Sequence, residues 1–531
     1  MLDRLPFDVL FSVLEHLEVQ DLVRASQVSH YFSAALQYRT VWKAAYTHTT
    51  LARPPGPCIG QSLHDFRSTL CTSARVERSW PPAPARQNPR VRSVPINSKN
   101  VFCGVISGRW MLVADRDRIN CYDHEMKPAG GGRGPVYVPP PGCQIRFFKC
   151  FDAKAEGGEQ VAYAVCEEVL DGDQDWFGGQ WPGLNAATNI KVFRIRPSKS
   201  PAAFPIVFES ILELRDEHAL QGFSEVTLKG DHLLIRKHDG AATGQQLVDA
   251  VWVINLRMRR VFKPSLSEGD FDTRYSSLRV ITSSSYLLVI RYPRMRSGHI
   301  IDNADTFEAF PLPRVDDSNP SAVQFLRPSH TGRLNTWASY HYPSIDTMDW
   351  SIEYTDARTR ETTIAFPAML SRQLRMLRFT LSSKACGTAA ASAAISDGSD
   401  LGSISFAADK VDGFPTLPSD SSYRVMFNPT MLGRPRMLVF GSKHASCLVP
   451  RSARPWPTQV LEGYTLDVDG GTGVRVVEKG ERASYEILPS FEKVLGFDAT
   501  SGRMFAVSGV PAMGTGLVIR KEWVLNVVDI V

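Results

Sequence analysis

The sequence has no segment suited to crossing a membrane or directing secretion. No apolar run approaches the roughly 18 residues of a transmembrane helix. The first apolar segment contains acidic residues, which argue against a secretory signal and a mitochondrial presequence. Basic residues are dispersed and the net charge is only +5, so the charge pattern does not indicate nucleic acid as the main partner. We therefore expect a protein of the cytoplasm or nucleus with neither a membrane nor a nucleic acid as partner.

Closely spaced cysteine pairs are also missing. The nine cysteines are scattered from Cys58 to Cys447, and no two have the two-residue spacing that metal sites and thiol-redox motifs use. Their odd number and irregular spacing indicate reduced, mostly buried thiols in the cytosol or nucleus. We accordingly expect no metal ion and no cofactor.

The motifs of common enzyme classes do not occur either. Aspartates alternate in 171–175 as in a calcium loop, but Trp176 and Pro182 stand where that loop needs a glycine and a bidentate glutamate. The glycine-rich stretch 130–135 lacks the lysine and the strand–helix context of a phosphate-binding loop. Neither a Gly-x-Ser-x-Gly elbow nor a His-Glu-x-x-His pair is present. We expect a protein without catalytic activity of its own.

What the chain does have is an unusually apolar helical segment, LPFDVLFSVLEHL, at residues 5–17. At 100° per residue its apolar side chains cover about 200° of the helix circumference, whereas packing on one core needs roughly 100°. Such a helix must be covered from two sides, and its short neighbourhood can cover only one. This indicates a docking surface for a partner protein; the alternative is a helical cap on the rest of the same chain.

Further short helices are expected after this segment. Ser29 is placed to cap a helix, and Trp42 and Tyr46 lie one helical turn apart. The order Leu-Pro, Asp-Val-Leu, Asp-Leu, Val-Ser and Trp-x-x-x-Tyr over residues 3–46 resembles the F-box family, although Phe32 stands where many members carry Trp. The spacing holds across all the expected helices, while the resemblance covers under a tenth of the chain.

The resemblance implies a partner and a function. F-box modules bind the Skp-type adaptor of cullin-based (SCF) ubiquitin ligases, so the chain is expected to be a substrate-recognition subunit of such a ligase. Apolar side chains of the module would form the adaptor-binding surface, although some must serve the module's own core. The predicted adaptor-binding residues are Leu5, Pro6, Val9, Leu10, Val13, Leu14, Leu17, Leu22, Val28 and Trp42.

From about residue 100 helical periodicity nearly disappears and β-hairpin patterns recur. Strand–turn–strand patterns in 106–123 and 229–261 have looser copies at intervals of roughly 40–70 residues, which favours a β-propeller of seven or eight blades. The pattern resembles degenerate WD-type repeats that lack the Gly-His signature. We expect the last strand, 522–531, to pair with one near 91–101 and to close the ring. The alternative is a pair of packed β-sandwiches.

The sequence thus predicts a multidomain α plus all-β chain: a helical F-box module at 1–50, a linker at 51–95 and a propeller at 96–531. The linker ends rich in proline and arginine and has room for short helices. Propeller loops are expected to bind a target protein, whose identity does not follow from the sequence. The predicted target-contact loop carries the aromatic residues Trp176, Phe177 and Trp181.

Two other functions fit the same features. One is an enzymatic propeller, a hydrolase or lyase, with a helical cap. The other is an F-box scaffold that does not transfer ubiquitin.

Overall fold

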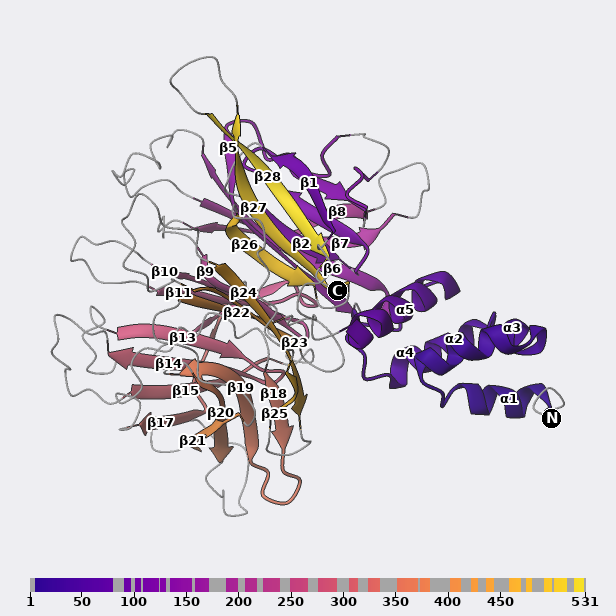
Figure 1. Ribbon diagram of the computed structural model, residues 1–531. Helices are drawn as coiled ribbons and strands as arrows, with labels where there is room; N and C mark the ends of the chain where they lie inside the picture. The colour runs from indigo at the N-terminus through magenta and orange to yellow at the C-terminus, as the bar shows by residue number, and fades with distance from the viewer. Residues whose placement is uncertain are drawn as a thin grey trace.

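A computed structural model shows N-terminal helices followed by a long series of β-strands. The residues that it describes are 5–79, 90–96, 101–106, 108–123, 125–129, 134–154, 158–170, 188–198, 206–216, 223–238, 249–265, 276–293, 305–313, 323–334, 351–370, 373–382, 402–411, 422–427, 436–443, 458–468, 474–479, 491–498, 501–512 and 520–529. Figure 1 shows the described helices together at one side of a large β-structure.

The helices make up an N-terminal module. In the described part of the chain they are α1 (Phe7–Leu14), α2 (Val19–Val28), α3 (His30–Ala35), α4 (Arg39–His48) and α5 (Leu63–Ser79). None of these helices has the length and apolar content that crossing a membrane requires.

The module has its own hydrophobic core. Trp42 of α4 is completely buried at its centre, and its indole Nε1 donates a hydrogen bond to the Leu36 carbonyl oxygen (2.8 Å). The predicted cap of the third helix is confirmed, because the Ser29 hydroxyl accepts a hydrogen bond from the Phe32 amide (3.3 Å). Helix α5 packs into the same core through Phe66 and Leu70.

Within the described residues the strands pair into six sheets, and the eight-stranded one consists of two four-stranded groups joined at β17 and β21. We call the resulting seven groups blades. Blade 1 is β2 (Phe102–Ile106), β3 (Trp110–Ala114) and β4 (Ile119–Tyr122). Blade 2 is β5 (Cys143–Lys154), β6 (Gln160–Leu170), β7 (Thr188–Pro197) and β8 (Ile206–Asp216). Blade 3 is β9 (Phe223–Lys229), β10 (His232–His238), β11 (Asp249–Asn255) and β12 (Arg260–Pro264), with β16 (Val323–Leu326) added to its edge.

The remaining blades continue in chain order. Blade 4 is β13 (Ser276–Thr282), β14 (Tyr286–Pro293), β15 (Asp305–Pro311) and β17 (His330–Leu334). Blade 5 is β18 (Ile352–Thr355), β19 (Thr362–Leu370), β20 (Gln373–Ser382) and β21 (Gly402–Lys410). Blade 6 is β22 (Ser422–Phe427), β23 (Arg436–Lys443), β24 (Thr458–Val468) and β25 (Val474–Lys479). Blade 7 is β26 (Phe491–Asp498), β27 (Arg503–Ala512), β28 (Arg520–Asp529) and β1 (Val91–Ile96).

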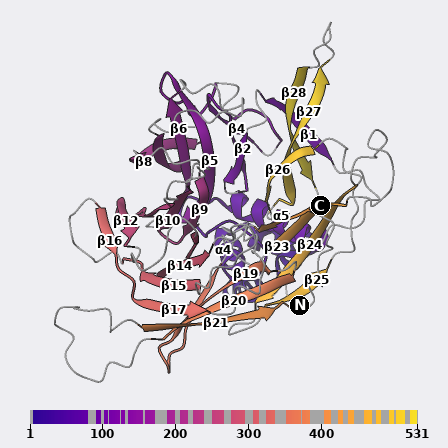
Figure 2. The same ribbon diagram turned by 90° about the vertical axis from the view of Figure 1, so that its left-hand side faces the viewer.

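The blades are arranged around a ring, as Figure 2 shows. First strands of successive blades contact one another, as β2 does with β5, β5 with β9, and β9 with β13. This is the arrangement of a β-propeller. The prediction of a seven- or eight-bladed propeller is therefore confirmed, with seven blades among the described strands, and the alternative of packed β-sandwiches is wrong.

Two parallel pairings join neighbouring blades, and no local pattern in the sequence predicts them. Strand β17 pairs with β21, so blades 4 and 5 form one eight-stranded sheet. Strand β16 leaves blade 4 and pairs with β12 of blade 3. Parallel strands need a long connection between them, whereas hairpin signals in a sequence are local.

The ring closes as expected. Strand β28 pairs with β27 on one side and with β1 on the other, in a register that runs from Val91 opposite Val528 to Ile96 opposite Trp523. The segment expected as a linker at 51–95 therefore contributes α5 to the helical module and β1 to the ring. In Figure 1 the yellow β28 lies beside the indigo β1.

Blades 4 and 5 are also joined by a half-buried carboxylate. Glu353 on β18 accepts hydrogen bonds from the Ser284 hydroxyl (2.8 Å) and the Ser285 amide (3.0 Å), both in the turn between β13 and β14. Burial raises the pKa of Glu353, but hydrogen bonds from Ser283, Ser284 and Ser285 lower it by more, so the pKa lies below its ordinary value.

We expect the Glu353→Gln variant to be less stable than the wild type at neutral pH and to approach it in acid. A depressed folded-state pKa means that the carboxylate's contribution is present above the unfolded-state pKa and is lost as the pH falls through the folded-state pKa. Urea unfolding of both proteins over a pH series measures the difference, with Asp117→Asn at an exposed position as control. A difference that does not change with pH would contradict this explanation.

Candidate functional site

Helix α1 carries apolar side chains both on the side that packs against the module and on the side that faces solvent. Leu10 and Leu14 are buried in the module core. Val9 and Val13, one helical turn apart, are 46% and 45% exposed. Pro6, which precedes the helix, is exposed as well. The helix thus presents apolar side chains both to its own core and to solvent, in agreement with the width of the apolar arc in the sequence.

Aromatic residues at the start of α1 form a second exposed apolar group. The ring of Phe7 packs edge-on against Phe11 and Tyr31 (centroids 5.4 Å from each) and against Tyr38 (6.0 Å). Phe7 remains 39% exposed and Tyr38 51%. The Tyr31 hydroxyl donates a hydrogen bond to the Leu5 carbonyl oxygen (2.6 Å), which fixes the chain where it enters the helix.

The structure divides the predicted adaptor-binding residues by their burial. Val28, the last residue of α2, is the most exposed of them at 73%. Those in the module core are Leu10, Leu14, Leu22 and Trp42. The half-buried ones are Leu5 and Leu17, and the exposed ones are Pro6, Val9, Val13 and Val28. A role of any of them in binding an adaptor stays a prediction.

We define the docking surface as Pro6, Phe7, Val9, Val13, Val28 and Tyr38. Phe7 and Tyr38 were not among the predicted residues, because nothing in the sequence tells an exposed aromatic side chain from a core one. Burying a Val or Phe side chain at a partner's surface is worth about 1.5–3 kcal/mol. The docking surface can therefore support specific binding of an apolar partner surface.

The predicted target-contact residues Trp176, Phe177 and Trp181 lie outside the described residues. The strands that flank them are described: Leu170 ends β6 and Thr188 begins β7. Both lie at the end of blade 2 that is opposite to the turn between β5 and β6. Since β6 has 11 residues, the two ends of the blade are roughly 35 Å apart.

The helical module contacts the near end of that same blade. The Ile59 amide donates a hydrogen bond to the carbonyl oxygen of Gly158, in the turn between β5 and β6 (2.9 Å). Arg109, in the turn between β2 and β3, forms an ion pair with Asp65 of α5 (3.4 Å). The module thus lies on the face formed by these two turns, and Figure 2 views the ring from the opposite face, with the helices behind it.

Candidate chemical groups in the ring are sparse. Among the described residues, no cluster of three or more His, Cys, Asp or Glu side chains could hold a metal ion. The seven cysteines in the described segments are all buried or half-buried. Burial, with the charge of Asp123, raises the pKa of Cys121 to about 12, so this thiol is protonated at neutral pH.

Comparison with known protein families gives one match. A family model described as F-box-like matches residues 2–48. No curated protein matches the chain significantly.

Several solved structures are similar in outline only. The β-propeller domain of Nup133 from Vanderwaltozyma polyspora is 8% identical, with 84% of this chain and 99% of that chain covered and a TM-score of 0.27. A thermostable family-43 glycoside hydrolase is 11% identical (66% and 98% covered, TM-score 0.25). The α-L-arabinanase of Cellvibrio cellulosa, complexed with arabinohexaose, is 9% identical (59% and 96% covered, TM-score 0.20). These TM-scores are too low to support an argument, and the fold rests on the strand pairing.

The family match and the geometry agree on the same segment. The match of the family model ends at residue 48, where α4 ends, and it includes every residue of the docking surface. The chain thus carries an F-box-like domain at residues 2–48, in front of a β-propeller.

Proposed function

We propose that this protein is the substrate-recognition subunit of an SCF-type E3 ubiquitin ligase in the cytoplasm or nucleus. The F-box-like domain would bind a Skp-type adaptor and, through it, a cullin. The propeller would bind the target protein. The observation that carries the proposal is the F-box-like match to a module whose first helix leaves Val9 and Val13 exposed.

The two binding functions have separate faces available to them. The helical module that carries the F-box-like domain contacts the turns between the first and second strands of blades 1 and 2, through Asp65 at Arg109 and Ile59 at Gly158. The opposite face receives the chain at Leu170 and Thr188, on either side of the predicted target-contact loop. We propose that the target binds at this opposite face, away from the adaptor.

Catalysis in this proposal belongs to the assembled ligase. The complex would hold target lysines close to a ubiquitin carrier, and tethering of this kind raises the effective concentration of the reacting groups. The enzymatic propeller and the scaffold without ubiquitin transfer stay as alternative hypotheses, and no observation on the described residues favours either.

The Val9→Glu/Val13→Glu variant is expected to bind a purified Skp-type adaptor at least tenfold more weakly, about 1.4 kcal/mol. Both side chains face solvent, so the module should still fold, whereas carboxylates at an apolar interface lose their hydration without gaining a partner. Surface plasmon resonance with immobilised adaptor measures the affinity, and thermal unfolding monitors the fold.

The matched control introduces the same charge elsewhere on the module. Thr47→Glu/Ser68→Glu alters two exposed positions on α4 and α5 and should bind the adaptor as the wild type does. Equal binding by the Val9→Glu/Val13→Glu variant, or no binding by the wild type, would refute the proposal. Proteins that bind both the wild type and this variant, and that accumulate on the wild type only when the proteasome is inhibited, are the candidate targets.

A further inference from the structure

Helix α5 is the longest helix in the described part of the chain, with 17 residues, and it lies beyond the F-box-like match. One side of the helix packs in the module core through Phe66, Leu70 and Ala74. The docking surface contains no residue of α5. The exposed side of this helix is therefore available to a different partner.

Three arginines follow one another along that exposed side, and we call Arg67, Arg75 and Arg78 the arginine row. All three side chains are exposed. At 100° and 1.5 Å per residue, they fall within an arc of about 80° and extend along about 16 Å of the helix. The two acidic residues of α5, Asp65 and Glu77, each lie about 80° outside this arc.

The charge of the arginine row is not neutralised within the described part of the molecule. No carboxylate among the described residues forms an ion pair with any of the three arginines. Asp65 pairs instead with Arg109 of the ring (3.4 Å). In the sequence no acidic residue follows Glu77 until Asp115, so the chain that leaves α5 brings no counter-charge with it.

The first arginine of the row is held in place by an aromatic ring. The guanidinium of Arg67 lies over the Trp42 ring, 5.8 Å from its centroid. Such a contact orients the guanidinium through the face of the ring and leaves its N–H donors able to bind an anion. A guanidinium that is already oriented loses less side-chain entropy when it binds a partner.

Arg67 and Arg75 also act together on one point of the surface. Cys71 lies one helical turn from each of them and is half-buried. Burial raises the pKa of the Cys71 thiol, and the positive charges of both arginines oppose this rise by a smaller amount. The arginine row is therefore a continuous electrostatic feature of α5.

The other end of the module has the opposite charge. Residues 5–38, which contain α1 to α3, carry four acidic residues and one arginine. Residues 39–79, which contain α4 and α5, carry six lysines and arginines and two acidic residues. An acidic partner is repelled by the first part and attracted by the second, so the two ends of the module favour different partners.

The chemistry of the arginine row indicates the class of its partner. Guanidinium groups bind carboxylates bidentately, and an extended peptide of about six residues spans 16 Å. Nucleic acid fits less well, because proteins that bind duplexes through phosphate make about 6–10 such contacts. The phenyl ring of Phe66 is buried, so α5 exposes no Phe, Tyr or Trp side chain on which a base could stack.

We propose that the arginine row is a second docking surface of the helical module, and that it binds an extended acidic segment, rich in Asp and Glu, of a partner protein. This inference goes beyond the proposed function and does not depend on it, since it uses no residue of the docking surface on α1 to α4.

Fluorescence anisotropy with the full chain tests the proposal. The probe is a labelled peptide of about twelve residues in which Glu and Ser alternate, and the reference peptide has Gln in place of Glu. The wild type should bind only the Glu peptide, and more weakly as the salt concentration rises. Arg67→Gln/Arg75→Gln/Arg78→Gln should bind it about tenfold more weakly. Gln is a good helix former, so this variant should keep α5 folded.

A matched variant separates the site from the overall charge. Arg24→Gln/Arg358→Gln/Arg360→Gln removes the same charge from three other exposed positions and should bind the Glu peptide as the wild type does. Thermal unfolding checks the fold of both variants. An equal loss of binding in the two variants, or no binding of the Glu peptide by the wild type, overturns the proposal.

Two further measurements test the nature of the partner and the independence of the site. Tighter binding of a labelled single-stranded oligonucleotide than of the Glu peptide, lost in the arginine-row variant, would assign the row to nucleic acid and overturn the proposal. Capture of a Skp-type adaptor by this variant should be unchanged, and its loss would contradict a separate site. Failure of the wild type to capture the adaptor overturns the proposed function alone.

Discussion

The Glu167→Gln variant is expected to lower the free energy of unfolding of the ring by about 3–5 kcal/mol. Glu167 on β6 is completely buried and contacts cations from two blades. It accepts a hydrogen bond from Arg146 Nε of β5 (2.9 Å) and pairs with Lys237 Nζ of β10 (2.7 Å). Lys237 is itself completely buried and donates to the Thr188 hydroxyl (2.7 Å). Loss of the carboxylate removes a partner that both cations share between blades 2 and 3.

Denaturant unfolding followed by circular dichroism measures this loss. The control is Glu159→Gln. The Glu159 carboxylate pairs with Arg194 (3.4 Å) near the surface, so its loss should lower the free energy of unfolding by less than about 1 kcal/mol. Should the single variant fail to fold, Glu167→Leu/Lys237→Met provides the comparison, because removal of both charges is expected to recover stability. Equal unfolding midpoints for Glu167→Gln and the wild type would show that the pair contributes little.

Deletion of residues 520–531 is expected to abolish cooperative unfolding of the ring. Strand β28 is the partner of both β27 and β1, so its removal exposes two strand edges and separates β1 from the rest of blade 7. It also removes Leu525 and Val527, which are buried against Met111 and Val113 of blade 1. Each such side chain contributes about 1.5–3 kcal/mol, and the total stability of a domain is only about 5–15 kcal/mol.

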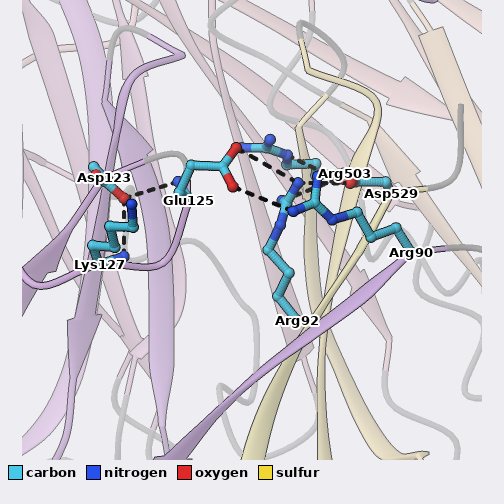
Figure 3. Close-up of polar contacts among 7 residues, drawn as sticks. All are labelled: Arg90, Arg92, Asp123, Glu125, Lys127, Arg503 and Asp529. Atoms are coloured by element: carbon cyan, nitrogen blue, oxygen red, sulfur yellow. Dashed lines mark hydrogen bonds and ion pairs between the residues drawn. The ribbon is translucent and has the colours of Figure 1, made fainter.

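A graded version of the experiment uses the charged residues at the closure, shown in Figure 3. Asp529 at the end of β28 pairs with Arg92 of β1 (3.0 Å) and Arg503 of β27 (2.9 Å). Arg92 also lies 3.8 Å from Glu125, which follows β4 of blade 1. Asp529→Asn should cost about 1–3 kcal/mol, since hydrogen bonds to charged groups are stronger than neutral ones.

The full deletion and the single substitution make a consistent series. Urea unfolding followed by circular dichroism should show a lower midpoint for Asp529→Asn and no cooperative transition for the deletion. The exposed Asp117→Asn should match the wild type. A deletion variant that keeps the wild-type midpoint would mean that β28 does not close the ring.

The sequence by itself determined the elements that depend on local pattern. The helical module followed from the apolar arc of residues 5–17 and from the Ser29 cap, which the Phe32 amide confirms. The propeller followed from recurring hairpin patterns, and its closure from an apolar last strand that needed a partner near 91–101. Periodicity, caps and turns act over a few residues, so they are present in the sequence before the chain folds.

Only the tertiary structure decided how these elements face one another. Val9 and Leu10 are adjacent and both apolar, yet Val9 faces solvent and Leu10 lies in the core, because the packing of α1 against α3 and the module core determines which side of α1 is covered. Glu167 and Lys237 meet only because blades 2 and 3 are neighbours. The hydrogen bond from the Ile59 amide to the Gly158 carbonyl oxygen likewise requires the module to be docked on the ring. Such contacts join residues far apart in the chain, so they are fixed by packing geometry and leave no pattern in the sequence around either partner.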